Sequence, residues 1–186
     1  YELRLHSCGS LVSTAGLDSA PRLRRLSLSG LASFETLSLP AELPALESLR
    51  LRGMAGLEDL DDLPPLPALE EATIWEMNSL ASLTGFQLPG SMDFLDFRDL
   101  PALTNLDGLA ALTAVGGNVF IRDNASLTNL DGLSAITSVG GSLFIRDNDV
   151  LSMCSSGLFN LLNGGGIAGA VTIQNNAPGC NSPAEI

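Results

Sequence analysis

The sequence predicts a repeat solenoid of about eight coils, in which each repeat forms one coil stacked on the next. Pairs of apolar residues recur along the chain, and their first members are separated by 23 residues four times, then by 24, 24 and 28. A period of this length is typical of solenoids. Within each pair one outward residue separates two inward ones, as in a β-strand. The pairs are Leu3/Leu5, Leu26/Leu28, Leu49/Leu51, Ala72/Ile74, Leu95/Phe97, Val119/Ile121, Leu143/Ile145 and Val171/Ile173.

Composition supports one aliphatic domain and argues against several classes of protein. Apolar residues make up 45% of the 186 residues and aromatic residues 5%, which suits layers of stacked Leu and Val. The net charge of −12 argues against nucleic acid as a partner, because phosphates need a basic surface. No apolar run approaches the roughly 18 residues that span a membrane, so we expect no membrane insertion of this segment. The chain starts at Tyr1 without an initiator Met or a signal peptide, and we interpret it as a mature or trimmed fragment.

The position three residues after each apolar pair changes character along the chain. A solenoid turn leaves backbone groups pointing inward, and Asn can satisfy them and stack on the next Asn as a ladder. We therefore predict a structural ladder of Asn124, Asn148 and Asn176 in the last three coils. Leu and Met cannot form hydrogen bonds with these backbone groups and need an apolar surrounding, so we expect the first five coils to differ from the last three in turn geometry. The earlier occupants are Cys8, Leu31, Met54, Met77 and Leu100.

Further apolar residues follow this position and predict the second wall of the core. Pro and Gly then recur before each next pair, which makes long helices unexpected before residue 150. The pairs Gly116-Gly117 and Gly140-Gly141 permit positive φ and mark the corners before the next strands. The wall residues are Leu11, Phe34, Leu57, Leu80, Leu103, Leu127 and Leu151, with Leu37, Leu60, Leu83, Leu106 and Leu130 three positions further on.

The end of the chain predicts a C-terminal cap closed by a disulfide. Apolar residues at helical spacing within Ser155–Asn163 are followed by three Gly residues, which indicates a short capping helix over the open end of the core. Cys154 precedes this helix and Cys180 follows the last strand, so we predict a bond between them that stabilises by about 3.5 kcal/mol. Cys8 lies seven coils away and is expected to be unpaired.

Two coils are almost copies of each other, and they carry a resemblance to a known family. Residues 103–124 read LTNLDGLAALTAVGGNVFIRDN, and residues 127–148 read LTNLDGLSAITSVGGSLFIRDN. The pattern LTxLDGLxxLTxVGGxLxIxxN resembles the receptor L-domain family and its bacterial and fungal surface-protein relatives. The resemblance is strong over about 92–176 and weakens to a leucine-rich-repeat-like pattern over 1–91. It implies a right-handed parallel β-helix used for recognition at a cell surface.

These observations define one solenoid domain over 1–186 with three parts. Degenerate leucine-rich coils occupy 1–91, L-domain-like coils occupy 92–150, and the disulfide-closed cap occupies 151–186.

The outward strand positions form columns that predict a ligand-binding face. Seven of the nine Arg residues fall in these columns, together with Trp75, Phe94, Phe120 and Phe144. Arg and aromatic side chains are enriched in binding hot spots. The alternative is that the Arg residues pair with Asp96, Asp99, Asp123 and Asp147, since stacked like charges favour interleaved carboxylates or an anionic partner. The predicted face consists of Arg50, Arg52, Trp75, Arg98, Phe120, Arg122, Phe144 and Arg146.

The sequence gives little support for metal binding, cofactors or a glycan on the chain. There is no Cys-x-x-Cys motif and one His, so we expect no metal and no cofactor. Asp107 and Asp131 suggest a calcium ladder, but a turn in which Asp accepts local backbone hydrogen bonds is favoured. Asn124-Ala125-Ser126 matches a glycosylation sequon, yet Asn124 should point inward and carry no glycan.

The function predicted from these features is recognition without catalysis. We expect a bacterial protein, extracellular or on the cell surface, that binds a protein or a glycan through its exposed parallel sheet. His6 has no nucleophile motif beside it, so we predict that the chain is not an enzyme. The open first strand, residues 2–6, also offers an edge for self-association. The alternatives are a structural spacer and, less favoured, a polysaccharide-active β-solenoid enzyme built on carboxylates and Arg.

Overall fold

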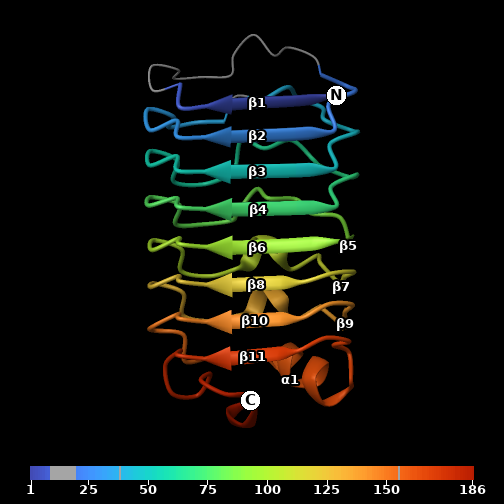
Figure 1. Cartoon of the computed structure of the whole chain (residues 1–186), viewed down its shortest axis with the longest axis vertical. Coiled ribbons are helices and arrows are strands. Elements are labelled where there is room, and N and C mark those ends of the chain that lie inside the picture. Colours follow the sequence, from blue (N-terminus) through green and yellow to red (C-terminus); the bar gives the residue numbers. More distant parts are fainter. Residues whose placement is uncertain (9–19, 38, 155) are drawn as a thin grey trace.

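The computed structural model describes residues 1–8, 20–37, 39–154 and 156–186, and it shows a parallel β-solenoid. One eight-stranded parallel sheet has the order β1-β2-β3-β4-β6-β8-β10-β11. Along each strand the chain runs from right to left in Figure 1, returns behind the sheet and enters the next strand below, which is a right-handed path. These strands are β1 (Glu2–His6), β2 (Arg25–Ser29), β3 (Ser48–Arg52), β4 (Glu71–Trp75), β6 (Phe94–Arg98), β8 (Val119–Arg122), β10 (Leu143–Arg146) and β11 (Val171–Gln174).

The number of complete turns is slightly lower than the predicted eight coils. Eight strands are joined by seven connections, and the first connection passes through residues outside the described part of the chain. About six turns are therefore described from strand to strand.

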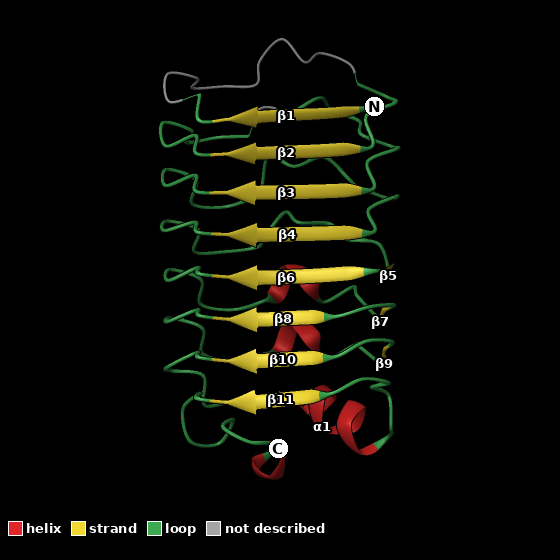
Figure 2. Cartoon of the chain, viewed as in Figure 1, coloured by secondary structure: helices red, strands yellow, loops and turns green. Residues whose placement is uncertain are grey.

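The return segments carry short elements of their own behind and beside the large sheet (Figure 2). A second parallel sheet has the order β5-β7-β9 and consists of two-residue strands. Three single-turn helices and one α-helix complete the described structure. These elements are β5 (Ser91–Met92), η1 (Asp107–Leu109), β7 (Ala114–Val115), η2 (Asp131–Leu133), β9 (Ser138–Val139), α1 (Ser156–Asn163) and η3 (Pro183–Glu185).

The core is a continuous apolar column between the large sheet and the return wall. The strand register places each apolar pair directly beside the next, for example Leu28 beside Leu51 and Leu51 beside Ile74. From β2 onward these side chains are almost fully buried, apart from the half-buried Val171, and burying one Leu stabilises by about 1.5–3 kcal/mol. The predicted wall residues from Phe34 to Leu151 are buried as well, whereas Leu11 lies outside the described residues.

The corner that follows each strand has the same backbone conformation in every coil, so the predicted difference in turn geometry is wrong. The residue before each ladder position has a positive φ between 53° and 63° in all eight coils. Gly occupies this position in two coils, where the left-handed conformation carries no side-chain penalty. Because the corner is set by the coil and not by the ladder residue, Leu, Met and Asn all follow it. The eight residues are Ser7, Gly30, Gly53, Glu76, Asp99, Asp123, Asp147 and Asn175.

The two Gly pairs lie at the corners before β8 and β10, as predicted, and they serve close stacking rather than a positive φ. Neither pair is among the described residues with positive φ. A Cβ atom on Gly140 would lie 2.2 Å from the carbonyl oxygen of Gly116 in the neighbouring coil. Such a distance is far below van der Waals contact, so these glycines let successive coils approach each other.

The C-terminal helix forms the last layer of the return wall. Helix α1 packs tightly on the segment after η2, since a Cβ atom on Gly157 would lie 2.3 Å from the carbonyl oxygen of Ser134. Leu158 and Leu161 of α1 are buried, while Ser155 lies outside the described residues. The residues after β11, including η3, lie at the same end of the solenoid (Figure 1). The end is thus closed by both segments rather than by the helix alone.

Candidate ligand-binding face

The predicted Arg and aromatic residues gather on the outer face of the large sheet. The register aligns Arg52, Trp75, Arg98, Arg122 and Arg146 in one column across β3 to β10. A second column runs through Arg50, Thr73, Asp96, Phe120 and Phe144. All eight members of the predicted face are exposed or half-buried. The structure therefore brings these residues together on one surface.

Several of the Arg residues have a carboxylate partner, as the alternative interpretation expected. Arg52 donates two hydrogen bonds to Glu76, of 2.9 and 3.1 Å, and this guanidinium lowers the pKa of Glu76. Arg50 lies 3.6 Å from Glu71, and Arg146 is hydrogen-bonded to Asp147. Exposed pairs of this kind contribute little to stability because water and salt screen them. They do fix the directions in which the side chains point.

Arg98 and Arg122 are held differently from the other Arg residues of the column. The Arg98 guanidinium lies 5.5 Å from the Trp75 ring centre, and its Nε is 3.5 Å from Asp96 Oδ2. Arg122 lies 6.0 Å from the Phe120 ring centre. Among the described residues, no carboxylate lies within 4.0 Å of Arg122.

The aromatic rings of the face pack against each other and against Arg side chains. Trp75 has Arg52 on one neighbouring strand and Arg98 on the other, at 5.7 and 5.5 Å from its ring centre. Phe120 and Phe144 are stacked with their ring centres 4.7 Å apart and an angle of 3° between the planes. Since neighbours occupy these ring faces, the rings are pre-arranged and offer mainly their edges to a ligand.

Asp96 is the residue of this face that sequence reasoning missed as a site residue. Period two places it outward, yet its side chain is only 9% exposed because neighbouring side chains cover it. Burial raises the pKa of Asp96 above its ordinary value, against the lowering effects of Arg98 and Arg122. Its Oδ1 atom is buried without a hydrogen-bond partner among the described residues. The pattern of alternating residues carries no signal for such lateral burial.

An acidic column runs beside the Arg column at the positive-φ corner. It consists of Asp99, Asp123 and Asp147, each directly after an Arg of the face. Burial, followed by the charges of Asp99 and Asp147, raises the pKa of Asp123. Carboxylates therefore lie beside the Arg column. Of the two ways in which stacked Arg charges can be balanced, nearby carboxylates or an anionic partner, the first is present in this structure.

A hollow of about 440 Å³ lies on the same face, over β1 to β4. Small side chains at Ser27 and Ser48 line it, and Arg4, Arg50 and Trp75 stand around them. Ser48 donates a 3.1 Å hydrogen bond to Glu71 on the next strand. The face is therefore recessed over its first four strands and carries its stacked aromatic rings over β6 to β10.

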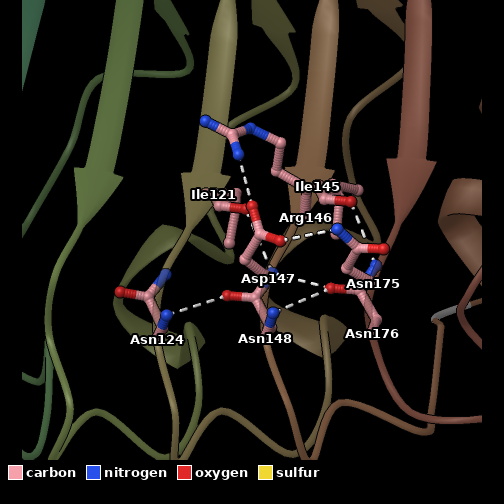
Figure 3. A network of polar contacts seen from close by, with 8 residues as sticks. All are labelled: Ile121, Asn124, Ile145, Arg146, Asp147, Asn148, Asn175 and Asn176. Atoms are coloured by element: carbon pink, nitrogen blue, oxygen red, sulfur yellow. Dashed lines mark hydrogen bonds and ion pairs between the residues drawn. The ribbon is translucent and has the colours of Figure 1, made fainter.

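The predicted Asn ladder lies inside the solenoid, opposite in direction to the face (Figure 3). Asn124 and Asn148 are fully buried, and Asn176 is 8% exposed. Each side chain clamps the corner of the preceding coil: Asn148 Oδ1 accepts from Asn124 N at 3.1 Å, and Asn148 Nδ2 donates to the Ile121 carbonyl at 3.1 Å. The sequon Asn124 therefore has its amide in the core.

The ladder ends in the disulfide-bonded turn. The predicted bond between Cys154 and Cys180 is present, with Cα atoms 5.4 Å apart, and Cys8 is free and exposed. Asn176 Nδ2 donates to the Cys180 carbonyl at 2.9 Å, and Asn176 N donates to Asn181 Oδ1 at 3.0 Å. Asn181 thus takes the place of a further ladder residue, a role that the sequence analysis missed. The sequence did hold a signal for this role. No strand is predicted after β11, so no further ladder Asn follows to accept a hydrogen bond from the backbone N–H of Asn176.

The Asp residues of the twin coils lie in turns, with a detail different from the prediction. The side chains of Asn105 and Asn129 accept the local backbone bonds, each at 3.1 Å, from the N–H groups of Asp107 and Asp131. Within the described ranges, no group of three or more His, Cys, Asp and Glu side chains is placed to hold a metal ion. No helix in that part of the chain is long and apolar enough to cross a membrane.

Fold and face together define a parallel β-solenoid with a polar outer sheet that carries Arg and aromatic columns. Comparison of the chain with protein-family models, with curated proteins and with solved structures found no match.

Proposed function

We propose that this chain is a non-enzymatic recognition module of a bacterial cell-surface or secreted protein, which binds a protein or a glycan through the outer face of its eight-stranded sheet. The observation that carries the proposal is the state of Arg122. Arg122 is half-buried between Arg98 and Arg146 in the Arg column, and no carboxylate of a described residue lies within 4.0 Å of it. Arg is one of the residue types that are enriched in binding hot spots, and a ligand could supply the acceptor that Arg122 lacks.

Two further features support an extracellular recognition role. The Cys154–Cys180 disulfide suits an oxidising environment outside the cytosol. The twin coils resemble receptor L domains, whose leucine-rich-repeat-like sheets recognise ligands at cell surfaces. The ligand of this chain is not carried over from that resemblance, because ligand-contacting residues are not motif residues.

The covered state of Asp96 favours binding over catalysis. Carboxylate pairs that hydrolyse glycosidic bonds face a common open space about 5–10 Å across. The Asp96 side chain is 9% exposed, and its free oxygen is buried beneath neighbouring side chains. A carboxylate in this position is suited to orienting Arg98.

The test is a binding screen of the whole chain with a matched pair of variants. The screen uses an array of neutral and acidic glycans together with a panel of purified extracellular proteins. Arg122→Gln should abolish capture of any ligand found while changing the melting temperature by no more than about 2 °C, since substitutions at such positions usually change stability by less than about 0.5 kcal/mol. Gln is chosen because Glu would add another carboxylate beside Asp123.

Arg24→Gln is the control, since Arg24 lies outside the columns and is paired with Glu47 at 3.3 Å. Ligand capture that survives Arg122→Gln would place the ligand elsewhere on the solenoid. If the chain captures no glycan from the array and no protein from the panel, the result would favour the structural spacer.

A further inference from the structure

Three polar side-chain atoms on the outer face of β6 and β8 are buried without a hydrogen-bond partner. They are Asp96 Oδ1, Arg98 Nε and Arg122 Nε, and no other side-chain nitrogen or oxygen in the described ranges shares this state. Native proteins leave few buried polar groups unpaired, so a cluster of three on one surface calls for an explanation. Their position within the proposed binding face suggests that a ligand supplies the missing partners.

The three atoms come from side chains that converge from two neighbouring strands. Asp96 and Arg98 lie two residues apart on β6 and therefore point to the same side of the sheet. Arg122 on β8 is directly beside Arg98 in the register. The distance of 3.5 Å between Arg98 Nε and Asp96 Oδ2 is too long for a strong hydrogen bond. The cluster thus offers one acceptor and two donors over a small area.

We propose that Asp96, Arg98 and Arg122 form a subsite for a hydroxyl group of a neutral saccharide; the inference rests on the proposed function and names the chemical class of its ligand. A hydroxyl group carries one donor and two acceptor lone pairs, which matches one carboxylate oxygen and two guanidinium N–H groups. A saccharide presents many such groups on a compact ring. A carboxylate or phosphate group would leave Asp96 Oδ1 without a donor.

The charges around the subsite favour a neutral ligand over an acidic one. From β6 to β10 and the corners that follow these strands, the face carries three guanidinium groups and four carboxylates, and the whole chain carries a net charge of −12. An acidic glycan or an acidic peptide would meet repulsion within a screening length of about 8 Å. The charged groups are Arg98, Arg122, Arg146, Asp96, Asp99, Asp123 and Asp147.

A ligand can reach the covered atoms by shifting the ends of the two Arg side chains. Such a shift breaks the ring contacts of Arg98 and Arg122 with Trp75 and Phe120 and lengthens the 3.5 Å ion pair between Arg98 and Asp96, which the ligand hydroxyl would replace. Phe94 and Phe120 pack against each other next to the cluster, with ring centres 5.8 Å apart. Their exposed edges provide an apolar border for the C–H groups of a sugar ring.

The experiment measures binding of defined oligosaccharides to the whole chain by titration calorimetry and saturation-transfer NMR. The neutral probes are maltohexaose, cellohexaose and mannohexaose, and hexagalacturonate is the acidic probe. We expect at least one neutral probe to bind, and Asp96→Asn to weaken its binding at least tenfold. Asn keeps the size of the side chain and one acceptor oxygen but loses the charge and one acceptor. The control Arg24→Gln should bind as the unchanged chain does.

A purely structural role of Asp96 would appear as a lower melting temperature with unchanged affinity per folded molecule. Arg98→Lys serves as the second variant, because it keeps the positive charge and removes the Nε donor, and it should also weaken binding. Absence of binding by all three neutral probes, or unchanged affinity in both variants, overturns the subsite. If hexagalacturonate or a protein binds in an Arg122-dependent manner while the neutral probes do not, the proposed function stands and the saccharide subsite fails. If the face binds none of these ligands, both fail.

Discussion

Replacing Asn148 by Leu should destabilise the solenoid far more than replacing Asn105 by Leu. Asn148 is fully buried, and its side chain is hydrogen-bonded to the backbone at Asn124 N and at the Ile121 carbonyl. Leu can fill the space, since Leu100 occupies the equivalent position two coils before Asn148 and is buried there. It cannot pair with the two backbone groups, which would remain buried and unsatisfied.

The expected magnitude follows from the number of groups left without a partner. Each buried unsatisfied group costs about 1–3 kcal/mol, so two groups amount to about 2–6 kcal/mol. For a chain of this size, 1 kcal/mol corresponds to about 2–4 °C in melting temperature. Asn148→Leu should therefore lower the melting temperature by at least about 4 °C.

Asn105 is the matched control because it makes bonds of the same kind near the surface. Its Oδ1 accepts from Asp107 N at 3.1 Å, and its Nδ2 donates to Thr104 Oγ1 at 3.3 Å. Water can replace both partners after substitution, so we expect a loss of about 1 kcal/mol or less. Thermal unfolding followed by circular dichroism compares the two variants directly. Equal melting temperatures would refute the conclusion that the ladder satisfies buried backbone groups.

Three further outcomes are expected from the described contacts. Peptide mapping without reduction should find Cys154 linked to Cys180, and reduction should lower the free energy of unfolding by about 3.5 kcal/mol, a loss that an unchanged melting temperature would contradict. Gly132→Ala should lower the melting temperature strongly, because the added Cβ would lie 1.8 Å from the Leu106 carbonyl oxygen of the preceding coil, whereas Gly90→Ala should be tolerated, since its Cβ would lie 3.8 Å from the nearest atom. Asp96→Asn should raise the melting temperature at pH 7 but not at pH 3. Burial raises the pKa of this carboxyl above 3.8, so the native state loses stability as the pH rises above 3.8 and the buried carboxyl ionises, a loss that Asn avoids. Melting curves of both chains at the two pH values check the sign.

The architecture could be predicted from the sequence because its signals are local and repeated. The apolar pairs fix which side of each strand faces the core, and their spacing fixes the register, as the alignment of Leu51 with Ile74 shows. The Asn ladder was predictable for the same reason, since Asn124 and Asn148 occupy equivalent positions in near-identical coils. The disulfide followed from two Cys residues that flank the last strand and helix.

The corners and the covered carboxylate could not be predicted, because they depend on contacts between coils. Glu76 adopts a positive φ although the residue type gives no hint of it, since the coil must turn there in every repeat. Gly140 is required by the approach of the preceding coil rather than by its own backbone angles. Asp96 is at an outward position by period, and only the side chains of neighbouring strands bury it.

The ladder and the face are linked through three consecutive residues in the twin coils. In the triplet Arg122-Asp123-Asn124 the Arg lies on the outer face, the Asp turns the corner with φ of 59°, and the Asn is hydrogen-bonded inside the core. The next coil repeats the arrangement with Arg146-Asp147-Asn148. Each Asn side chain is hydrogen-bonded to the corner of the preceding coil, so Asn124 holds the corner that follows Arg98 and Asn148 holds the corner that follows Arg122. The buried Asn hydrogen bonds therefore help to hold the backbone from which Arg98, Arg122 and Arg146 project, and side chains that are ordered before binding lose less entropy when a ligand binds.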